Sequence, residues 1–246
     1  MDNRFDRPDQ NRYVAYFDML GLKTATRRNP AKAWESLKNL QSCMDEVSKL
    51  KIHVLDKDIV LVNIVKTIIL ADSVLIFTHG DSLNDLTAIL MLTSELFAKG
   101  LHRCVPLRGA ITYGEFFYDF DLNLFGGIPF VQAYELEKKA QWSGIVVDNL
   151  VAGKYRKTTF PKCPDGSSLV IEWDVPFKKN IKEKMWVLDW VKPHKNNFTI
   201  TPPISVTDYY SGFINLFGSY NELLPEVQEK YKNTVEFINY SLSNVN

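Results

Sequence analysis

The sequence predicts an α/β fold: an α+β sandwich in which helices flank a mixed β-sheet, with a C-terminal strand and helix appendage. Short aromatic and β-branched runs alternate with longer segments whose apolar residues recur at helical spacing. Glycines and prolines stand where these segments begin or end, as they do at helix and strand boundaries. After about residue 153, two tryptophan-bearing, strand-like runs replace the alternation.

Local signals place the elements of the first part. A strand over residues 13–20 ends at Gly21, and a helix over residues 30–50 starts at Pro30. A helix over residues 83–99 has Ser82 as its N-cap and Gly100 where a C-terminal cap belongs. The other expected elements are strands over 59–70, 74–77, 105–117 and 144–147, and a helix over 129–142.

The second part has a different pattern. Strand-like runs over residues 169–175 and 185–191 enclose a lysine-rich segment, which is either a phosphate-attracting patch or a solvated surface. Two helices follow, broken near Gly218. We therefore expect a polar N-terminal tail (residues 1–12), a core (13–152) and a C-terminal extension packed on the core (153–246).

Composition limits the function classes. In 246 residues, 29 basic side chains balance 29 acidic ones, which argues against nucleic acid or a membrane surface as a partner. The longest apolar stretch contains Lys66 and Asp72, each costing roughly 2.5–3.5 kcal/mol near a bilayer centre, so we expect no membrane span. Three scattered cysteines and a polar N-terminus predict a cytoplasmic protein.

Two aspartates interrupt the apolar strands. Asp18 ends the first strand, and Asp72 lies in the connection between the next two. Either one alone is typical of a solvent-exposed turn. Together they indicate more, because strands in a central sheet seldom carry acids without a partner or metal that offsets desolvation. If the strands are neighbours, the carboxylates meet at one sheet edge, where they can hold divalent cations for phosphoryl chemistry.

Four segments, in this order, resemble motifs of the class III nucleotidyl cyclases. YFDMLGLK (16–23) is similar to the first metal motif, in which an Asp ends the first strand before a tight glycine turn. IILADSVLIF (68–77) looks like the second metal motif on its hairpin. LRGAITYGE (107–115) and GGIPFVQAYELEKKAQWSGIVVD (126–148) resemble the next strand, the dimer-interface helix and the strand after it. The resemblance covers about residues 13–148 and implies a cyclase catalytic core there.

The resemblance also implies roles for particular residues. Asp18 and Asp72 would be the ligands of two divalent cations, Mn²⁺ or Mg²⁺, and the carbonyl of Met19 would be a further ligand of one. A nucleoside triphosphate would be the substrate. Its triphosphate would contact the backbone amides of Leu20, Gly21 and Leu22, which form a tight turn suited to anions.

The interface helix departs from the usual pattern. In the family an Asn and an Arg of this helix steady the transition state, and their positions fall near Val131 and Glu135 here, neither of which matches. This departure, together with the tryptophan-rich extension, is most similar to the pyrimidine cyclases of bacterial anti-phage defence, the Pycsar family. That similarity implies a homodimer that makes cyclic UMP or cyclic CMP, which would activate a separate effector protein.

The position that reads the base favours a pyrimidine. Purine cyclases carry a polar residue four positions before the second metal Asp, where this chain has Ile68, which can neither donate nor accept a hydrogen bond. A purine would leave ring nitrogens unpaired there, at about 1–3 kcal/mol each. The expected substrate is therefore UTP, or CTP, read from the opposite wall by Tyr16, Lys66 or Asn123.

Several alternatives stay open at this point. Arg108 interrupts an apolar strand, so it contacts either phosphate or a structural carboxylate partner. The missing Asn and Arg would also permit a catalytically silent, cyclase-like binding or scaffolding domain. A purine cyclase, or another two-metal nucleotidyl-transfer enzyme with a palm-like sheet, is a further alternative.

Overall fold

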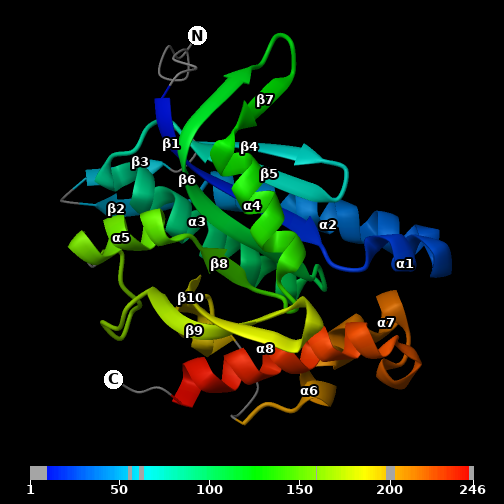
Figure 1. The fold of residues 1–246 in the computed structure, drawn as a ribbon. Helices are drawn as coiled ribbons and strands as arrows, with labels where there is room; N and C mark the ends of the chain where they lie inside the picture. Colours follow the sequence, from blue (N-terminus) through cyan, green and yellow to red (C-terminus); the bar gives the residue numbers. More distant parts are fainter. Residues whose placement is uncertain (1–9, 55–56, 61–63, 159, 198–202, 244–246) are drawn as a thin grey trace.

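A computed structural model describes residues 10–54, 57–60, 64–158, 160–197 and 203–243. Its centre is an eight-stranded mixed sheet in the order β4-β5-β1-β6-β8-β10-β9, with β7 paired to β6 (Figure 1). A separate hairpin is made by β2 and β3. The strands are β1 (Gln10–Met19), β2 (Lys51–Val54), β3 (Lys57–Val60), β4 (Val65–Leu70), β5 (Ser73–Thr78), β6 (Leu107–Asp119), β7 (Leu124–Gly127), β8 (Ile145–Val147), β9 (Val170–Phe177) and β10 (Ile181–Leu188).

Helices cover both faces of this sheet. On one face, α3 packs against β1, β4, β5 and β6, and α2 lies alongside α3; on the other face, α4 packs against β1 and β6 (Figure 1). The helices are α1 (Leu22–Arg28), α2 (Pro30–Ser48), α3 (Leu83–His102), α4 (Ile128–Lys139), α5 (Asn149–Thr158), α6 (Val206–Tyr210), α7 (Ile214–Phe217) and α8 (Pro225–Ser243). The predicted α+β sandwich is confirmed.

The helix starts follow from local chemistry. Pro30 occupies the first turn of α2, where its missing N–H costs nothing, and the side chain of Asn29 accepts a hydrogen bond from the Lys32 amide. At α3, Ser82 and Asp85 form a reciprocal capping box. These caps fix where each helix leaves the sheet.

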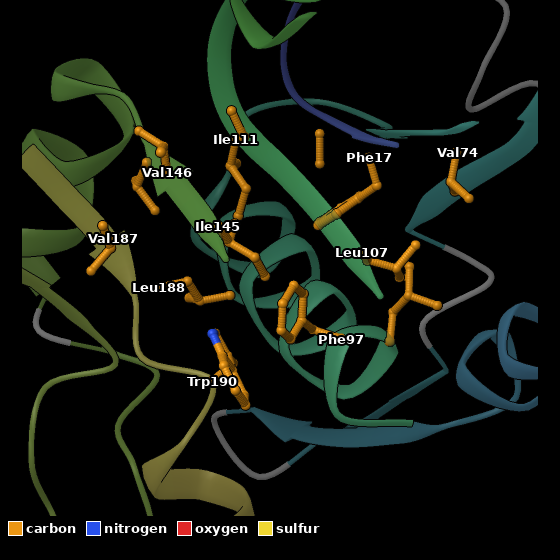
Figure 2. Packing of buried hydrophobic residues seen from close by; sticks show 14 of the residues in the cluster. Phe17, Val74, Phe97, Leu107, Ile111, Ile145, Val146, Val187, Leu188 and Trp190 are labelled. Carbon is orange, nitrogen blue, oxygen red and sulfur yellow. The ribbon is translucent and has the colours of Figure 1, made fainter. Parts of the chain in front are cut away.

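The main hydrophobic core fills the space between the sheet and α3 (Figure 2). Phe17 and Val74 project into it from β1 and β5, and the ring of Phe97 on α3 lies 4.6 Å from that of Trp190. Trp190 follows β10, so residues of the C-terminal extension share one core with the N-terminal strands. Burying such aromatic side chains contributes much of the stabilisation of the fold.

The C-terminal extension continues the sheet. Strand β10 pairs with β8 and with β9, and α8 lies against this hairpin (Figure 1). The rings of Trp142, Trp173 and Phe237 meet within 4.5–5.0 Å of one another, which joins the segment after α4, β9 and α8. This aromatic contact holds α8 against β9 and the segment after α4.

Several boundaries differ from the sequence predictions. The strand expected over 59–70 is wrong, because β3 and β4 are separate strands and β3 pairs with β2 instead. Gly100 lies inside α3, which continues to His102, because the turn after it closes at Arg103. Strand β1 begins at Gln10 and buries Arg12, so the expected tail overlaps the sheet by three residues. Sequence periodicity could not separate these cases, because each depends on pairing partners distant in the chain.

Two further elements were not foreseen. Gly126 and Gly127, which lay outside every expected strand and helix, end strand β7, and α1 is separated from the first strand by two residues. Helix α4 stops at Lys139, three residues before Trp142, because Trp142 leaves the helix to enter the aromatic contact with Trp173. Among the residues that the structure describes, no helix combines the length and apolar character needed to cross a bilayer.

Candidate active site

Asp18 stands in the middle of a row of side chains that crosses four strands. In the antiparallel register it lies beside Ser73 of β5 and Arg108 of β6, and Ser73 lies opposite Leu70 of β4. Residues opposite each other share a face, so these four side chains point to the same side of the sheet as α4. The row is the last one before β1 ends at Met19.

Asp72 lies next to this row. It occupies the two-residue turn between β4 and β5, in which Ala71 adopts a left-handed φ of 58°. The backbone amide of Met19 donates a hydrogen bond of 3.0 Å to the Asp72 carbonyl, which ties the turn to the end of β1. The strands that carry the two aspartates are therefore neighbours, and the carboxylates lie at one edge of the sheet.

The electrostatics of Asp18 show the closeness of the second carboxylate. Burial raises the pKa of Asp18, and the negative charge of Asp72 raises it further. Arg108, whose Nη2 lies 3.9 Å from Asp18 Oδ2, acts in the opposite direction, as does a weak hydrogen bond of 3.4 Å from Ser73 Oγ. The protein therefore offsets only part of the cost of burying the negative charge of ionised Asp18.

The aspartate pair fits a divalent cation in charge and ligand type. Hard cations such as Mg²⁺ take carboxylate oxygens, and Mg²⁺ sites often use one or two carboxylates together with substrate phosphates and water. Among the described residues, no group of three or more His, Cys, Asp or Glu side chains is placed to hold a metal. Asp18 and Asp72 are therefore a pair that depends on phosphate, water or a backbone carbonyl, such as that of Met19, to complete a coordination shell.

Arg108 has a structural partner. Its guanidinium forms an ion pair with Glu137 of α4 and donates a 2.8 Å hydrogen bond from Nη1 to the carbonyl of Ala140. Arg108 and Glu137 are both almost fully buried, and burial raises the pKa of Glu137. Of the two roles considered for Arg108, the structure shows the ion pair with a structural carboxylate, Glu137. The same guanidinium also faces Asp18.

The turn after β1 carries the three backbone amides that were predicted to contact phosphate. The amide of Leu20 donates to the carbonyl of Pro106 at 2.8 Å, so it is already occupied, and its prediction as a phosphate donor is wrong for this conformation. Gly21, at φ 79°, reverses the chain, and Leu22 starts α1, where backbone amides have no partner within the helix. The amides of Gly21 and Leu22 stay predicted triphosphate contacts.

A second row lies beside the Asp18 row. It contains Ile68, Leu75 and Tyr16, again on the α4 face. The Tyr16 hydroxyl shares a hydrogen bond of 2.8 Å with Ser73 Oγ, and its ring meets Phe130 of α4 edge-on. Ile68 is half-buried and packs against the same apolar cluster as Leu75. Tyr16, predicted to read the base from the wall opposite Ile68, lies in the same row as Ile68, so its placement on an opposite wall is wrong. Ile68 and Leu75 form an aliphatic wall next to the carboxylates.

Two predicted base contacts lie farther away. Lys66 belongs to the third row, roughly 14 Å along the strands from the Asp18 row. Asn123 lies in the turn between β6 and β7, and at the rise of an extended strand the segment from Arg108 to Asp119 is roughly 35 Å long. Asn123 therefore does not join this site within one chain, which corrects its prediction. Its distance was set by the length of β6, which extends beyond the predicted boundary.

The comparisons with known proteins agree with this architecture. No protein-family model matches the sequence, and no curated protein matches it significantly. The fold is similar to the catalytic core of a rhodopsin-guanylyl cyclase with converted specificity, solved with ATPαS: the TM-score is 0.53 at 13% identity, over 74% of this chain and 97% of that one. It is also similar to a bacterial light-regulated adenylyl cyclase, with a TM-score of 0.50 at 8% identity, over 95% of this chain and 57% of that one. This is the class III nucleotidyl cyclase fold.

Helix α4 of this cyclase fold presents an unusual outer face. Val131 and Glu135, at the positions where the class III pattern has Asn and Arg, are both exposed, one helical turn apart. Ile128 precedes them and is 71% exposed. The inner face of α4 carries Ala133 and Glu137 toward the sheet. The departure from the family pattern thus lies on the surface, away from the Arg108 ion pair.

Two residues near the aspartate pair were missed from the sequence. Glu137 could have been sought from the sequence, because Arg108 interrupts an apolar strand and a buried arginine needs a carboxylate partner. Lys230 of α8 gave no such signal: it lies more than 150 residues from Asp72, yet its positive charge lowers the pKa of Asp18. Only the packing of α8 beside the cyclase sheet brings it there.

Proposed function

We propose that this chain is a metal-dependent pyrimidine nucleotide cyclase, which converts UTP or CTP to the 3′,5′-cyclic monophosphate and diphosphate. The observation that carries the proposal is the meeting of Asp18 and Asp72 at one sheet edge of a class III cyclase fold. The resemblance to the pyrimidine cyclases of anti-phage defence supports a role for the product as a second messenger. It would then act on a separate effector protein.

The chemistry assigned to the protein is positioning and charge. Asp18 and Asp72 would hold two cations, Mn²⁺ or Mg²⁺, which when bound would favour an ionised 3′-hydroxyl and stabilise the departing diphosphate. Arg108 lies 3.9 Å from the Asp18 carboxylate and is also ion-paired with Glu137, so its charge is shared between the two carboxylates. The amides of Gly21 and Leu22 are the proposed donors to the triphosphate.

The proposed preference for a pyrimidine rests on the aliphatic row. Ile68 and Leu75 lie beside Tyr16, whose hydroxyl is already shared with Ser73. A purine edge against this wall would lose hydrogen bonds to water without replacement, at about 1–3 kcal/mol for each unpaired group. A smaller base that leaves the wall unfilled avoids that cost.

A two-fold homodimer is part of the proposal. Exposed apolar side chains gather on the β6–β7 hairpin and on α4, and a contiguous patch of this kind is typical of an interaction surface. A second copy is the proposed occupant, since isologous pairs are the commonest assembly and class III cyclases build their sites between two chains. The side chains are Phe117, Phe120, Leu122, Leu124, Ile128 and Val131.

Product analysis tests the proposal. The protein is incubated with Mn²⁺ and each of ATP, GTP, CTP and UTP at equal concentration, and the products are resolved by chromatography. We expect cyclic UMP or cyclic CMP to form faster than either purine product. Asp18→Ala and Asp72→Ala should each reduce turnover below a few per cent of wild type, whereas Asp45→Asn, on the exposed surface of α2, should not change it.

Each alternative gives a distinct result in the same assay. Faster cyclisation of ATP or GTP overturns the pyrimidine preference but keeps the cyclase. Triphosphate binding by calorimetry without any cyclic product indicates the silent, cyclase-like domain, which the residues Val131 and Glu135 would permit. Retention of activity in either aspartate variant shows that the metal assignment is wrong.

A further inference from the structure

A cavity of about 400 Å³ lies between α1, α7 and the start of α8. These elements lie at the same end of the molecule, and α1 contacts α7 (Figure 1). Small-molecule sites in proteins have volumes of about 300–1,000 Å³, so the cavity is large enough for a ligand. Among the described residues that line it, neither Asp18 nor Asp72 is present, so the cavity is distinct from the aspartate pair.

The interior of this cavity is apolar. Phe217 of α7 and Tyr231 of α8 line it and are buried. Val227 lies one helical turn before Tyr231, so both side chains are on the same face of α8. Leu224, just before α8, also lines the cavity but is 64% exposed. Apolar surface therefore continues from the buried side chains to the solvent, and a ligand with an apolar body would remove it from water.

Two arginines of α1 bring positive charge to the cavity. Arg27 and Arg28 line it from the last turn of this helix. Arg28 Nη1 lies 3.4 Å from Glu222 Oε2, and Glu222 is the one carboxylate in the lining that the structure describes. The Arg28 guanidinium also packs against Gly218, where any Cβ would overlap it. Arg28 is therefore engaged within the protein, and Glu222 compensates its charge.

Two other cations of the lining have no such partner. In the part of the chain that the structure describes, no carboxylate lies within ion-pair distance of Arg27 or of the half-buried Lys230. Glu226, one helical turn before Lys230 on α8, does not line the cavity. Two uncompensated positive charges therefore accompany the apolar interior, although the whole chain has equal numbers of basic and acidic side chains.

We propose that this cavity binds a small organic acid, whose apolar body packs on Phe217 and Tyr231 and whose carboxylate pairs with Arg27 and Lys230. A guanidinium can hold a carboxylate through two parallel hydrogen bonds, and an ammonium adds a compact positive charge. An apolar body without the acid would leave both cations uncompensated. A small inorganic anion would leave the apolar interior unfilled.

The proposed ligand is a free acid rather than a membrane surface. The apolar side chains that would hold it, Phe217 and Tyr231, are buried, so a small molecule can enter where a lipid surface cannot reach. The inference goes beyond the proposed function and does not depend on it, because binding of the acid needs neither a divalent cation nor a nucleotide. Most of the lining comes from α7 and α8, which gives the C-terminal extension a ligand-binding role.

The test is calorimetry of the full chain with decanoate, below the concentration at which decanoate forms micelles. Decanoate should bind saturably, each methylene removed from its chain should weaken binding by about fourfold, and uncharged 1-decanol should bind about tenfold more weakly. Arg27→Gln and Lys230→Gln should each weaken decanoate binding by about tenfold. Lys23→Gln is the matched control, because Lys23 is exposed on α1 but does not line the cavity. Val227→Phe should fill the cavity and remove binding, with circular dichroism as the check that the variant is folded.

Each outcome supports or overturns the inference, whether or not the protein is a cyclase. Saturable decanoate binding that Arg27→Gln weakens and Lys23→Gln does not supports it. Equal binding of decanoate and 1-decanol overturns it, because the cavity would then hold any apolar molecule. Displacement of decanoate by inorganic tripolyphosphate also overturns it, since the cavity would then belong to the triphosphate site. Binding to phosphatidylglycerol vesicles without saturable binding of decanoate would show that the surface meets lipid instead.

Discussion

Substituting Gly21 by alanine tests the turn that joins the first strand to the proposed phosphate contacts. Gly21 has φ 79°, in the left-handed region that costs an L-residue about 1–2 kcal/mol. A Cβ there would lie 2.9 Å from Cε1 of the buried Phe217 ring, closer than side chains normally approach. The substitution therefore strains both the backbone and the contact with α7.

The expected cost follows from these two contributions. Moving the Phe217 ring away from its preferred position adds about 0.5–1.5 kcal/mol to the backbone term. Restricting the unfolded chain returns about 0.4–1 kcal/mol, so the free energy of unfolding should fall by about 2 kcal/mol. For a domain of this size, that corresponds to a Tm lower by about 4–8 °C.

Thermal unfolding of Gly21→Ala beside Gly153→Ala measures this effect. Gly153 lies within α5, and a Cβ there would meet nothing within 4 Å, so alanine should raise stability by about 0.5–1 kcal/mol. In a Phe217→Ala background, Gly21→Ala should cost less, because only the backbone strain remains. Equal Tm values for Gly21→Ala and wild type would refute the reasoning about this turn.

Three further predictions concern charge, assembly and specificity. Because burial and the charge of Asp72 raise the folded-state pKa of Asp18, the folded protein holds an extra proton at pH values just above the unfolded pKa of about 3.8. The stability of the wild type therefore falls as pH rises through the window up to the raised pKa, and in urea unfolding without metal Asp18→Asn should gain stability relative to wild type as pH rises above about 4. A stability difference that does not change with pH would contradict the raised pKa. Val131→Asp should dissociate the proposed homodimer, as measured by sedimentation, and abolish turnover. Trp34→Asp, a substitution at a similarly exposed site on α2, should leave the dimer intact. An active Val131→Asp monomer would show that the mechanism does not need the dimer. Ile68→Lys should raise the ratio of ATP to UTP cyclisation by about tenfold, measured by competition in one reaction, and an unchanged ratio would show that this wall does not read the base.

Much of the fold could be predicted because its signals are local. Gly21 follows the end of strand β1, α2 begins at Pro30, and Ser82 caps α3, so each signal lies within a few residues of its element. The errors arose where a boundary depends on a distant partner. The range 59–70 reads as one apolar run, but β3 pairs with β2 and β4 pairs with β5, so the run is divided between two sheets.

The candidate site was predictable to the extent that one residue marks its own environment. An acid at the end of an apolar strand, as at Asp18, signals a desolvation cost wherever the strand lies. The occupied amide of Leu20 could not be foreseen, because its acceptor, the carbonyl of Pro106, belongs to a segment more than 80 residues away. The prediction that Asn123 contacts the base was also wrong, because the length of β6 carries Asn123 away from Asp18.

The sequence by itself determined the α+β class, the order of the main elements and the two aspartates, because periodicity, capping and buried charge are properties of short segments. The tertiary structure alone decided that Ser73, Asp18 and Arg108 form one row and that Glu137 completes the ion pair. It also decided that Lys230 of α8 lies near enough to Asp18 for its charge to lower the pKa of that carboxyl. These contacts arise from strand register and from the packing of α4 and α8, which depend on the free energy of the whole core rather than on any local pattern.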